Sequence, residues 1–583
     1  MKEFADFLGG HAPFDALSAD ELQRVVRRLE VEYFAAGATV VAVGESLTHV
    51  WVVRTGALEV VDGGRVVDLL GPGDMFGLEW VRSGLPSPVL VRAHEESLCL
   101  RIADPPAGLR LVRGLGRVAQ PLARLVRPIV WCDGTDRVRD VAERIGAARQ
   151  SCALVRAGGE LGIVTDLDFR RQVGTGEVGV DAPITALATV PALTIEEGAA
   201  QSAGLLRMIE RGVHHLVVVD HAERPVGVLR AVDLAGAEVR DSLLVRSAIG
   251  EARDIEELAA ACRLLPTMLV ELCDDGVPAG QIGAIHAAVV DAAVRRTLQL
   301  ETHPAMDGLR HSWVLLGSLA RKEPLPLSDV DTALIWADGC REEEAIRAEA
   351  REVLRGLQRC GFSLCTNGAN AHNPVFSRAR SDWIAAARGW QHDPTQDNAL
   401  LLSAMVADSR PLTDPELGDS LTQTIRSHTR TSQFLRALLD EALRWRPPTG
   451  FIRDFVVQHS GEHRGQLDLK PGGLTPVVAL ARWIAIAAGD ASGTTVERLH
   501  RGAGLGLLTT DEADTLAGGF ENVYGLLLHH EVHALRSGGA PTSTFIAPKE
   551  LDSLTRRHLR ETFRAIALVQ ARVDRHWLNR LPE

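Results

Sequence analysis

One segment, residues 313–336, limits the possible folds more than any other part of the chain. Two hydrophobic runs flank a polar stretch that opens with Gly317-Ser318 and, after ten further residues, reaches Asp329-Val-Asp331. Alternation along a strand places the two aspartates on one face. The segment therefore predicts two neighbouring strands, with a glycine–serine turn after the first and paired carboxylates before the second.

These residue types suit phosphate and metal chemistry. Glycine lets the backbone approach a phosphate closely, and the following N–H groups and the Ser318 hydroxyl can hold it. Asp329 and Asp331 can hold Mg²⁺, which prefers oxygen ligands and keeps some waters and substrate phosphates. The alternative is a plain turn followed by solvated aspartates, but the complete strand–turn–acidic pair–strand pattern favours a nucleotide site.

The string GSLARKEPLPLSDVDTALIW resembles the core of the DNA polymerase β-like nucleotidyltransferases. It is most similar to the branch of protein-PII uridylyltransferase and glutamine-synthetase adenylyltransferase, because Arg321, Glu323 and Ser328 also fit the pattern of that branch. The resemblance implies that Arg321 and Lys322 join the glycine–serine turn in binding nucleotide phosphates. It also implies an α/β transferase fold with Mg²⁺ as the cofactor.

The family carries a third carboxylate on a later strand. Asp408, in Met405-Val-Ala-Asp408-Ser-Arg410-Pro-Leu, matches its D-x-R-P-[LV] segment. By resemblance Asp408 completes the metal site or deprotonates the acceptor. A turn aspartate before proline is the alternative.

A second motif of the same branch, D-x-K-x-G-G, matches Asp468, Lys470, Gly472 and Gly473. The lysine would supply a point charge for phosphate and the glycines a close backbone approach. A lysine beside a helix-opening turn is the alternative. The chain departs from the family pattern between Cys365 and Pro374, which concerns base or acceptor recognition more than the metal site.

An internal repeat lies upstream. Its two units start at Pro128 and Pro191, offset by 63 residues, and end at Asp168 and Asp233, offset by 65. Each reads strand, helix, strand, strand, helix, and the repeat resembles a CBS pair. The resemblance implies that Thr165, Asp168 and Asp233 bind the ribose of an adenine nucleotide, although Arg230 replaces the expected hydroxyl in the second unit. Helix capping is the alternative role for these residues.

Residues 38–102 read as short strands between glycine turns, which predicts a small barrel or sandwich. The segment resembles a cyclic-nucleotide-binding domain through its glycines and Phe76. However, Leu78 follows the last glycine, Pro86-Ser87-Pro88 occupies the arginine region, and Glu79 and Arg82 are displaced. Without a placed arginine a cyclic phosphate loses its charge-assisted partner, so we expect a structural role. The glycines concerned are Gly56, Gly71, Gly73 and Gly77.

Composition excludes several classes of protein. A formal charge of -13 disfavours a general nucleic-acid binder. The N-terminus has no apolar signal-peptide core, and the apolar run 477–488 is broken by Arg482, so we expect a buried helix, no membrane span and a cytoplasmic protein. The eight cysteines form no CxxC pair, which indicates neither a zinc site nor a disulfide framework.

The sequence thus predicts a multidomain α+β chain. We expect it to be a Mg²⁺-dependent nucleotidyltransferase that moves a nucleoside monophosphate from an NTP to a protein acceptor, with an adenine nucleotide at the CBS pair. A homodimer is also expected, since CBS pairs commonly associate. The alternatives are an inactive nucleotide-sensing scaffold and RNA-directed transfer, which the acidic charge disfavours. The arrangement resembles bacterial nucleotidyltransferases of the DUF294 type, with a cyclic-nucleotide-binding-like β-barrel domain (1–108), tandem α/β CBS domains (118–240), a polymerase β-like nucleotidyltransferase domain (250–425) and an all-α C-terminal domain (430–583).

Overall fold

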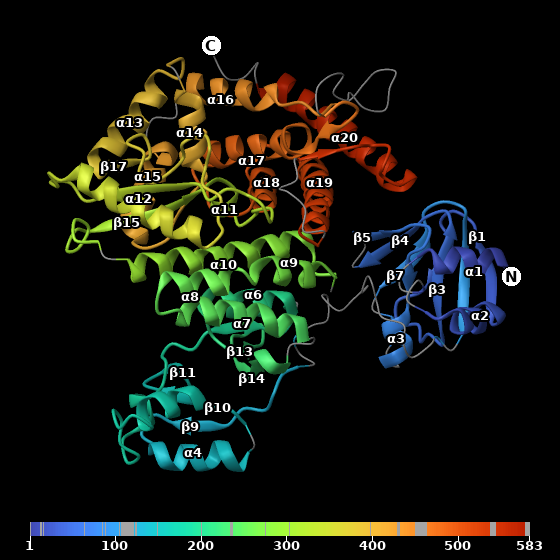
Figure 1. Cartoon of the computed structure of the whole chain (residues 1–583), viewed down its shortest axis with the longest axis horizontal. Coiled ribbons are helices and arrows are strands. Elements are labelled where there is room, and N and C mark those ends of the chain that lie inside the picture. The colour runs from blue at the N-terminus through green and yellow to red at the C-terminus, as the bar shows by residue number, and fades with distance from the viewer. Residues whose placement is uncertain are drawn as a thin grey trace. The chain divides into compact units, whose positions relative to one another are not determined.

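The computed structural model confirms a multidomain fold of mixed α and β structure (Figure 1). The chain divides into two compact units, residues 117–244 and the remainder. The structure describes residues 2–11, 14, 17–62, 65–83, 86–87, 89–103, 105, 122, 125–148, 150–199, 201–233, 237–274, 276–301, 303–396, 398–427, 432–448, 463–536 and 544–577.

The N-terminal region forms two four-stranded sheets, β1-β8-β3-β6 and β2-β7-β4-β5. Strand β3 shows why they pack: Trp51 and Val53 enter the core between the sheets, while Val50 and Val52 pack with the N-terminal helices. The elements are α1 (Lys2–Gly9), α2 (Ala19–Arg27), β1 (Leu29–Phe34), β2 (Thr39–Val41), β3 (His49–Thr55), β4 (Leu58–Asp62), β5 (Arg65–Leu70), β6 (Met75–Phe76), α3 (Leu78–Ser83), β7 (Leu90–Ala93) and β8 (Ser97–Ala103).

The unit of residues 117–244 contains two three-stranded sheets of the same topology, β11-β10-β9 and β12-β13-β14. In each, the middle strand pairs parallel with the strand before the helix and antiparallel with the strand that follows. The elements are β9 (Trp131–Asp133), α4 (Val138–Ala147), β10 (Cys152–Ala157), β11 (Glu160–Thr165), α5 (Asp166–Asp168), β12 (Thr194–Glu196), α6 (Gln201–Arg211), β13 (His215–Val219), β14 (Pro225–Arg230) and the start of α7 (Ala237–Glu251).

The segment of residues 313–336 contributes the two central strands, β16 and β15, of a four-stranded sheet with the order β17-β16-β15-β18. Its face with Trp313 and Trp336 packs against α10 and α12, while Gly418 of α15 lies against Ser312 on the other face. The elements are α8 (Ile255–Cys262), α9 (Leu265–Asp274), α10 (Ala279–Leu300), β15 (His311–Leu316), α11 (Gly317–Ala320), β16 (Thr332–Trp336), α12 (Glu343–Arg359), β17 (Ser377–Ala379), α13 (Arg380–His392), α14 (Ala399–Ala407), β18 (Ser409–Pro411) and α15 (Pro415–Ser427).

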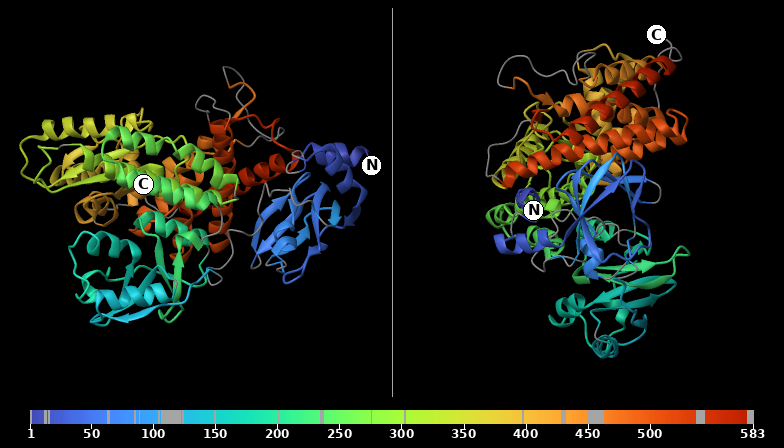
Figure 2. Two further views of the ribbon diagram at one scale, coloured as in Figure 1. Left: turned by 60° about the horizontal axis from the view of Figure 1, so that its bottom comes forward. Right: turned by 90° about the vertical axis from the view of Figure 1, so that its right-hand side faces the viewer.

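The remaining chain is a helical bundle, drawn in orange and red in Figures 1 and 2. Helices α16 to α20 pack in sequence, each against the next, and Gly489 at φ +78° ends α17. The elements are α16 (Ser432–Arg444), β19 (Leu467–Asp468), η6 (Lys470–Leu474), α17 (Thr475–Ala488), α18 (Thr495–Gly504), α19 (Thr510–Arg536), β20 (Phe545–Ile546) and α20 (Ser553–Trp577).

Among the described residues one helical stretch, Lys470–Ala488, is long and apolar enough to cross a membrane. It is 67% buried within the protein. Its one charged residue beyond the first turn, Arg482, pairs with a buried carboxylate. Core helices of globular proteins share these properties, in agreement with the sequence-based expectation of a buried helix.

Candidate active site

The turn after β15 requires glycine for two reasons. Gly317 has φ +60°, a conformation that costs other residues strain. A Cβ at this position would also lie only 3.0 Å from Asp331 Oδ2. The Gly317 N–H donates to the Asp408 carbonyl at 2.9 Å, so the phosphate donors left to this turn are the Ser318 hydroxyl and the N–H groups of residues 318–320, which begin α11.

The acidic pair lies beside this turn, as expected. Asp331 is half-buried, and burial together with the charge of Asp329 raises its pKa, while the Cys365 thiol, Lys470 and Arg321 act in the opposite direction. Cys365 donates a hydrogen bond to Asp331 from the segment paired in parallel with Val330. A divalent cation would stabilise the charged form of Asp331 beside Asp329.

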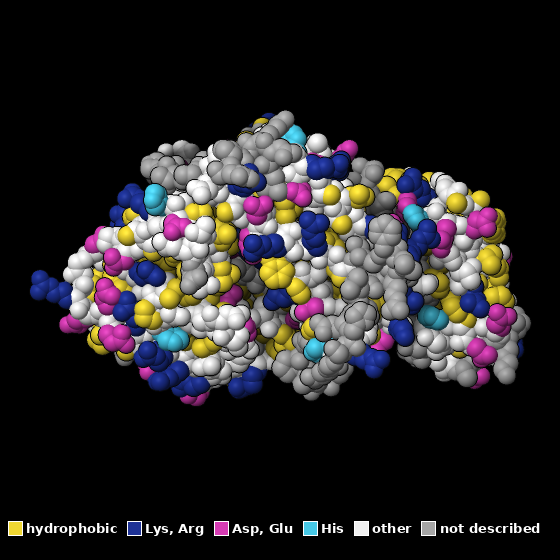
Figure 3. Space-filling view, turned by 90° about the horizontal axis from the view of Figure 1, so that it is seen from above, with side chains coloured by type: hydrophobic (Ala, Val, Ile, Leu, Met, Phe, Trp, Pro, Cys, Tyr) yellow, Lys and Arg dark blue, Asp and Glu magenta, His cyan; other side chains and the backbone are white. Residues whose placement is uncertain are grey.

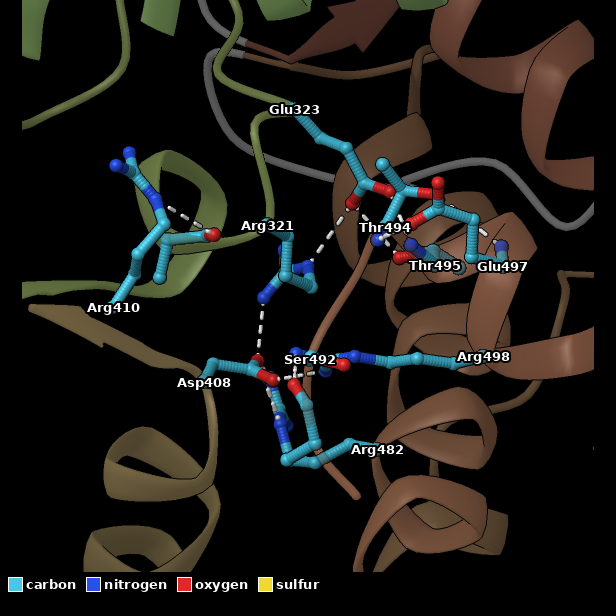
Figure 4. Close-up of polar contacts among 12 residues, drawn as sticks. Arg321, Glu323, Asp408, Arg410, Arg482, Ser492, Thr494, Thr495, Glu497 and Arg498 are labelled. Atoms are coloured by element: carbon cyan, nitrogen blue, oxygen red, sulfur yellow. Dashed lines mark hydrogen bonds and ion pairs between the residues drawn. The ribbon is translucent and has the colours of Figure 1, made fainter. Parts of the chain in front are cut away.

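Asp408 is the centre of a buried charge cluster (Figure 4). Its side chain has no exposed surface, and its carboxylate accepts from Arg321 Nη1 (2.5 Å), from Arg482 Nη2 (2.6 Å) and from Arg498. Burial alone would raise the pKa of Asp408, but the guanidinium groups of Arg482, Arg321 and Arg498 outweigh it and hold the pKa well below its usual range. The Asp408 side chain is therefore saturated with charge-assisted hydrogen bonds.

The expected three-carboxylate metal site is not formed. No group of three or more His, Cys, Asp or Glu side chains suited to a metal occurs within the described ranges, which include Asp329, Asp331 and Asp408. Asp408 lies next to Gly317 through its backbone, but its carboxylate is directed to the three arginines. The physical reason is that three cations compete for this carboxylate inside the protein, where an unpaired guanidinium is costly.

Arg321 also differs from expectation, whereas the phosphate-binding role of Lys322 stays a prediction. Arg321 is 8% exposed and bonds to Asp408 and to Glu323 Oε2 (3.0 Å), so in this structure it holds the loop rather than a phosphate. Lys322 adopts φ +62° and ends α11, with its N–H bonded to the Leu319 carbonyl. Both residues fix the course of the chain between the turn and the acidic pair.

The D-x-R-P segment contributes a second positioning residue, Arg410, whose role sequence reasoning missed. Its guanidinium donates to the carbonyls of Leu319 (2.9 Å) and Ala320 (3.2 Å), the last residues of α11. It also forms two hydrogen bonds with Asp291 of α10, at 2.7 and 2.9 Å. The segment thus bonds to both ends of α11: the Asp408 carbonyl accepts from the Gly317 N–H at its start, and the Arg410 guanidinium donates to the carbonyls at its end.

The helical bundle contacts the same loop at further points. Glu323 accepts from the backbone N–H and from the hydroxyl of Thr495 (2.8 Å), at the start of α18. Tyr524 donates to the Pro324 carbonyl (2.8 Å). Glu531 accepts from the Leu327 N–H (2.8 Å), two residues before the acidic pair. None of these contacts was predictable from local sequence patterns, because each joins residues more than 170 positions apart.

Lys470 is an exposed cation on the bundle side of the site. Its charge lowers the pKa of both Asp331 and Glu531, which places it near the acidic pair. Burial nevertheless raises the pKa of Glu531 to about 7. Lys470 therefore lies on the side of the acidic pair, and its phosphate-binding role stays a prediction.

The glycines of the same motif serve helix packing. A Cβ at Gly473 would lie 2.7 Å from Val523 Cγ1, in the bundle core, and a Cβ at Gly472 would lie 2.9 Å from Pro448 Cδ. The side of each glycine that would carry a Cβ therefore faces protein atoms. The expected close approach of Gly472 and Gly473 to phosphate is therefore replaced by a close approach of helices.

In the repeat unit, the candidate ligand residues act as caps and ion pairs. Thr165 Oγ1 and its N–H both bond to Asp168 Oδ2, at 2.7 and 2.8 Å, at the start of α5. Asp233 accepts from Arg127 Nη2 (2.7 Å) and Arg230 Nε (2.6 Å). Burial alone would raise the pKa of Asp233, but both arginines lower it to about 2. Arg230 is thus engaged with Asp233, and the second module has no uncommitted carboxylate at this position.

The N-terminal glycines take turn and packing roles. Gly56, Gly73 and Gly77 all have positive φ, and a Cβ at Gly56 would collide with Ser97. The Glu79 and Arg82 side chains and Pro88 lie outside the described residues.

Charged side chains of both signs are intermixed with hydrophobic ones on the face drawn in Figure 3.

Comparison with protein-family models identifies four domains in the predicted order. The models described as "Cyclic nucleotide-binding domain", "CBS domain", "Putative nucleotidyltransferase DUF294" and "Putative nucleotidyltransferase substrate binding domain" match residues 31–105, 184–240, 263–404 and 432–577. The chain therefore combines a nucleotidyltransferase domain of the DUF294 type and its partner domain with cyclic-nucleotide-binding and CBS domains. The glycine–serine turn and the acidic pair lie in the DUF294 match, and Lys470 lies in the partner domain.

Individual relatives match parts of the chain. The "HTH-type transcriptional regulator Cmr" of Mycobacterium tuberculosis (strain CDC 1551 / Oshkosh) is 28% identical over 24% of this chain and 67% of its own length. "Uncharacterized protein Rv0104" of M. tuberculosis (strain ATCC 25618 / H37Rv) is 36% identical over 16% of this chain and 18% of its own length. Both matches leave a third or more of the relative uncovered.

Solved structures match parts of the chain. A "CBS domain protein PAE2072 from Pyrobaculum aerophilum complexed with AMP" is 24% identical, with a TM-score of 0.20, over 21% of this chain and 98% of that one. The regulatory domain of Toxoplasma gondii PKA with cAMP is 22% identical, with a TM-score of 0.17, over 18% of this chain and 41% of that one.

Proposed function

We propose that the chain transfers a nucleoside monophosphate from an NTP to a hydroxyl of a protein acceptor, as protein-PII uridylyltransferase and glutamine-synthetase adenylyltransferase do. The observation that carries the proposal is the acidic pair beside the glycine–serine turn. Asp331 Oδ2 would lie 3.0 Å from a Cβ at Gly317, and Lys470 acts on the same carboxylate. The match to the DUF294 nucleotidyltransferase model supports it.

Asp329 and Asp331 fit Mg²⁺, because this ion is commonly held by one or two carboxylates and completes its shell with water and substrate phosphates. When bound, Mg²⁺ would neutralise the triphosphate and polarise its phosphoryl oxygens. Ser318 and the first N–H groups of α11 would hold the phosphates, and Lys470 would contribute a further positive charge. The acceptor oxygen attacks the α-phosphorus, its proton passes to water, and the bond to the β-phosphate breaks, so that pyrophosphate leaves.

The repeat unit would regulate the transfer by binding an adenine nucleotide in its first module. Thr165 and Asp168 are partly exposed there and bond to each other, whereas Asp233 of the second module is engaged by two arginines. Calorimetric titration of the full chain with AMP tests this assignment. Thr165→Val should abolish binding, and Thr175→Val, an exposed threonine of the same module, should not. Equal AMP binding by both variants would exclude the first module as the site.

The alternative is a nucleotide-binding regulatory scaffold without transfer activity. The pairing of the Asp408 carboxylate with three arginines favours this alternative, because the family's third acidic group would then not reach the metal. In the decisive experiment the chain is incubated with Mg²⁺, candidate acceptor proteins and each of the four NTPs labelled at the α-phosphate. Protein-bound label that is lost in Asp329→Asn supports transfer.

The matched control is Asp338→Asn. Asp338 follows the opposite end of β16 and accepts the Ser381 N–H at 2.8 Å, so its amide variant keeps an acceptor. We expect at least about a 100-fold loss of transfer in Asp329→Asn and little change in Asp338→Asn. NTP binding without incorporation from any of the four nucleotides would support the scaffold. Label found in RNA but in no protein would show RNA-directed transfer.

A further inference from the structure

A cavity of about 280 Å³ lies between α12 and the loop of residues 368–374. The helix contributes Arg347 and Arg351, and the loop contributes Asn370 and His372. No residue of the glycine–serine turn or the acidic pair lines it. The cavity is therefore separate from the proposed transfer site, although the loop that forms one wall begins three residues after Cys365.

Arg347 is held in a fixed orientation. Its Nη2 donates to Glu343 Oε2 (2.7 Å) and to the Ser377 carbonyl (3.1 Å), and its guanidinium carbon lies 5.6 Å from the ring centroid of Trp336. The side chain is only 13% exposed. Its Nε is buried and has no partner within the described part of the chain. Arg347 is thus a positioned cation whose Nε donor is unused in the described part of the chain, while its Nη1 lies 3.8 Å from Glu344 Oε2.

Two loop residues also have buried polar atoms without partners among the described residues. Asn370 is 7% exposed; its Nδ2 donates to the Cys365 carbonyl at 2.9 Å, which leaves Oδ1 as an unpaired acceptor. His372 Nδ1 is likewise buried and unpaired. Such atoms are costly without a hydrogen-bonding partner, and here they belong to residues that line one cavity.

Two guanidinium groups lie on the wall of the cavity. Arg347 and Arg351 both line it, and no ion pair of Arg351 occurs in the described structure. Burial and the charge of Arg351 lower the pKa of His372, so the imidazole is neutral and acts through hydrogen bonds. Glu344 lies at the rim with a side chain that is 80% exposed. Because Arg347 pairs with Glu343 and lies 3.8 Å from Glu344, Arg351 is the cation that would chiefly attract an anionic group into the cavity.

We propose that this cavity binds a small ligand that carries both a phosphate and hydroxyl groups, of the class of sugar phosphates. The phosphate would accept from Arg347 Nε and Arg351, a task suited to guanidinium groups. A hydroxyl would donate to Asn370 Oδ1, which a fully ionised phosphate cannot do. The volume is at the low end for ligand pockets, which suits a single ring with a phosphate.

Occupancy has a consequence for the neighbouring site. Asn370 bonds to the Cys365 carbonyl, and the Cys365 thiol bonds to Asp331. A ligand that contacts Asn370 therefore orders the loop that places Cys365 beside the acidic pair. The ribose phosphate portion of a nucleotide has the same chemistry as a free sugar phosphate, so the experiment must separate these two sources.

Calorimetric titration of the full chain tests the proposal, with ribose 5-phosphate, ribose, inorganic phosphate and AMP as probes. We expect ribose 5-phosphate to bind more tightly than inorganic phosphate, and ribose not to bind. Arg351→Gln should weaken binding by about tenfold or more, as expected for a lost charge-assisted hydrogen bond. Arg355→Gln should have no effect, because Arg355 lies one turn further along α12 and pairs at the surface with Glu352.

Two further variants test whether binding depends on this cavity and not on the acidic pair. His372→Gln should also weaken binding, which provides a second test if Arg351→Gln fails to fold, as judged by circular dichroism. Asp329→Asn should leave ribose 5-phosphate binding unchanged. If AMP also binds and depends on Arg351, the natural ligand is a nucleotide; if only ribose 5-phosphate does, it is a free sugar phosphate. The proposal is overturned if no phosphorylated probe binds in an Arg351-dependent manner, or if Arg355→Gln has the same effect.

Discussion

Asp408→Asn tests the role that the structure gives to the buried charge cluster. The side chain of Asp408 is fully buried, and three guanidinium groups share its carboxylate. With Glu323, which also bonds to Arg321, the cluster carries three positive and two negative charges, a net charge of +1. The substitution raises this to +2 without a change in side-chain shape. Removal of one partner from a buried ion pair costs about 3–5 kcal/mol, and we expect the free energy of unfolding to fall by that amount.

The assay is urea unfolding at pH 7, followed by tryptophan fluorescence. Seven of the ten tryptophans lie at or after Trp313, so the signal reports mainly on the transferase and helical regions. Glu352→Gln is the control, because its pair with Arg355 is more than half exposed and should contribute less than about 1 kcal/mol. The folded pKa of Asp408 is depressed, so its contribution is present above its unfolded value of about 3.8 and is lost as the pH falls below that value.

Two results would refute the reasoning. A loss below about 1 kcal/mol for Asp408→Asn would show that the carboxylate does not hold the three arginines. A variant that stays folded but needs far more Mg²⁺ for half-maximal transfer would show that Asp408 is a metal ligand after all. We expect instead that the Mg²⁺ requirement of the folded variant changes little, whereas Asp329→Asn alters it strongly.

Three further substitutions test neighbouring features. Gly317→Ala should reduce the transfer rate by at least about tenfold, because its Cβ would lie against Asp331 of the acidic pair. Gly308→Ala is the control: Gly308 has a similar positive φ, but a Cβ there would meet no atom within 4 Å, so the transfer rate should not change. Glu531→Gln should make stability less dependent on pH between about 4.5 and 7. Burial raises the folded pKa of Glu531, so the free energy of unfolding of the wild type falls by up to about 3 kcal/mol as the pH rises through this window. If chemical denaturation gave the same dependence of unfolding free energy on pH for both proteins, this explanation would be contradicted. Arg410→Lys should cost about 2 kcal/mol in unfolding free energy and lower the transfer rate, because lysine cannot replace the paired hydrogen bonds to Asp291. Arg310→Lys, which changes an exposed ion pair, is the control and should cost less. Equal losses in the two variants would argue against the positioning role of Arg410.

The sequence predicted the transferase strands well because their signal is local. Two hydrophobic runs, a glycine at the turn and alternation at the acidic pair determine β15, α11 and β16 within 24 residues. The family resemblance put Asp408 on a later strand, and in the structure Asp408 immediately precedes β18, which pairs with β15. It did not predict the direction of the Asp408 carboxylate, because Arg482 and Arg498 lie 74 and 90 residues further along the chain.

The D-x-K-x-G-G motif shows a second limit. A lysine followed by two glycines reads as a phosphate loop, and Lys470 does lie near Asp331. The glycine signal is ambiguous, because a missing Cβ permits close approach of any backbone or side chain. Contact of Gly473 with Val523 depends on how α19 packs, which the motif does not encode.

The bonds between the loop of residues 321–331 and the bundle have a consequence for how this protein can be divided. A fragment that ends at residue 427 would keep every residue of the acidic pair and the glycine–serine turn, yet it would strip Asp408 of two of its three counter-ions. It would also release Glu323 from Thr495 and the Leu327 N–H from Glu531. The two matched transferase regions therefore depend on each other for the partners of their buried charges.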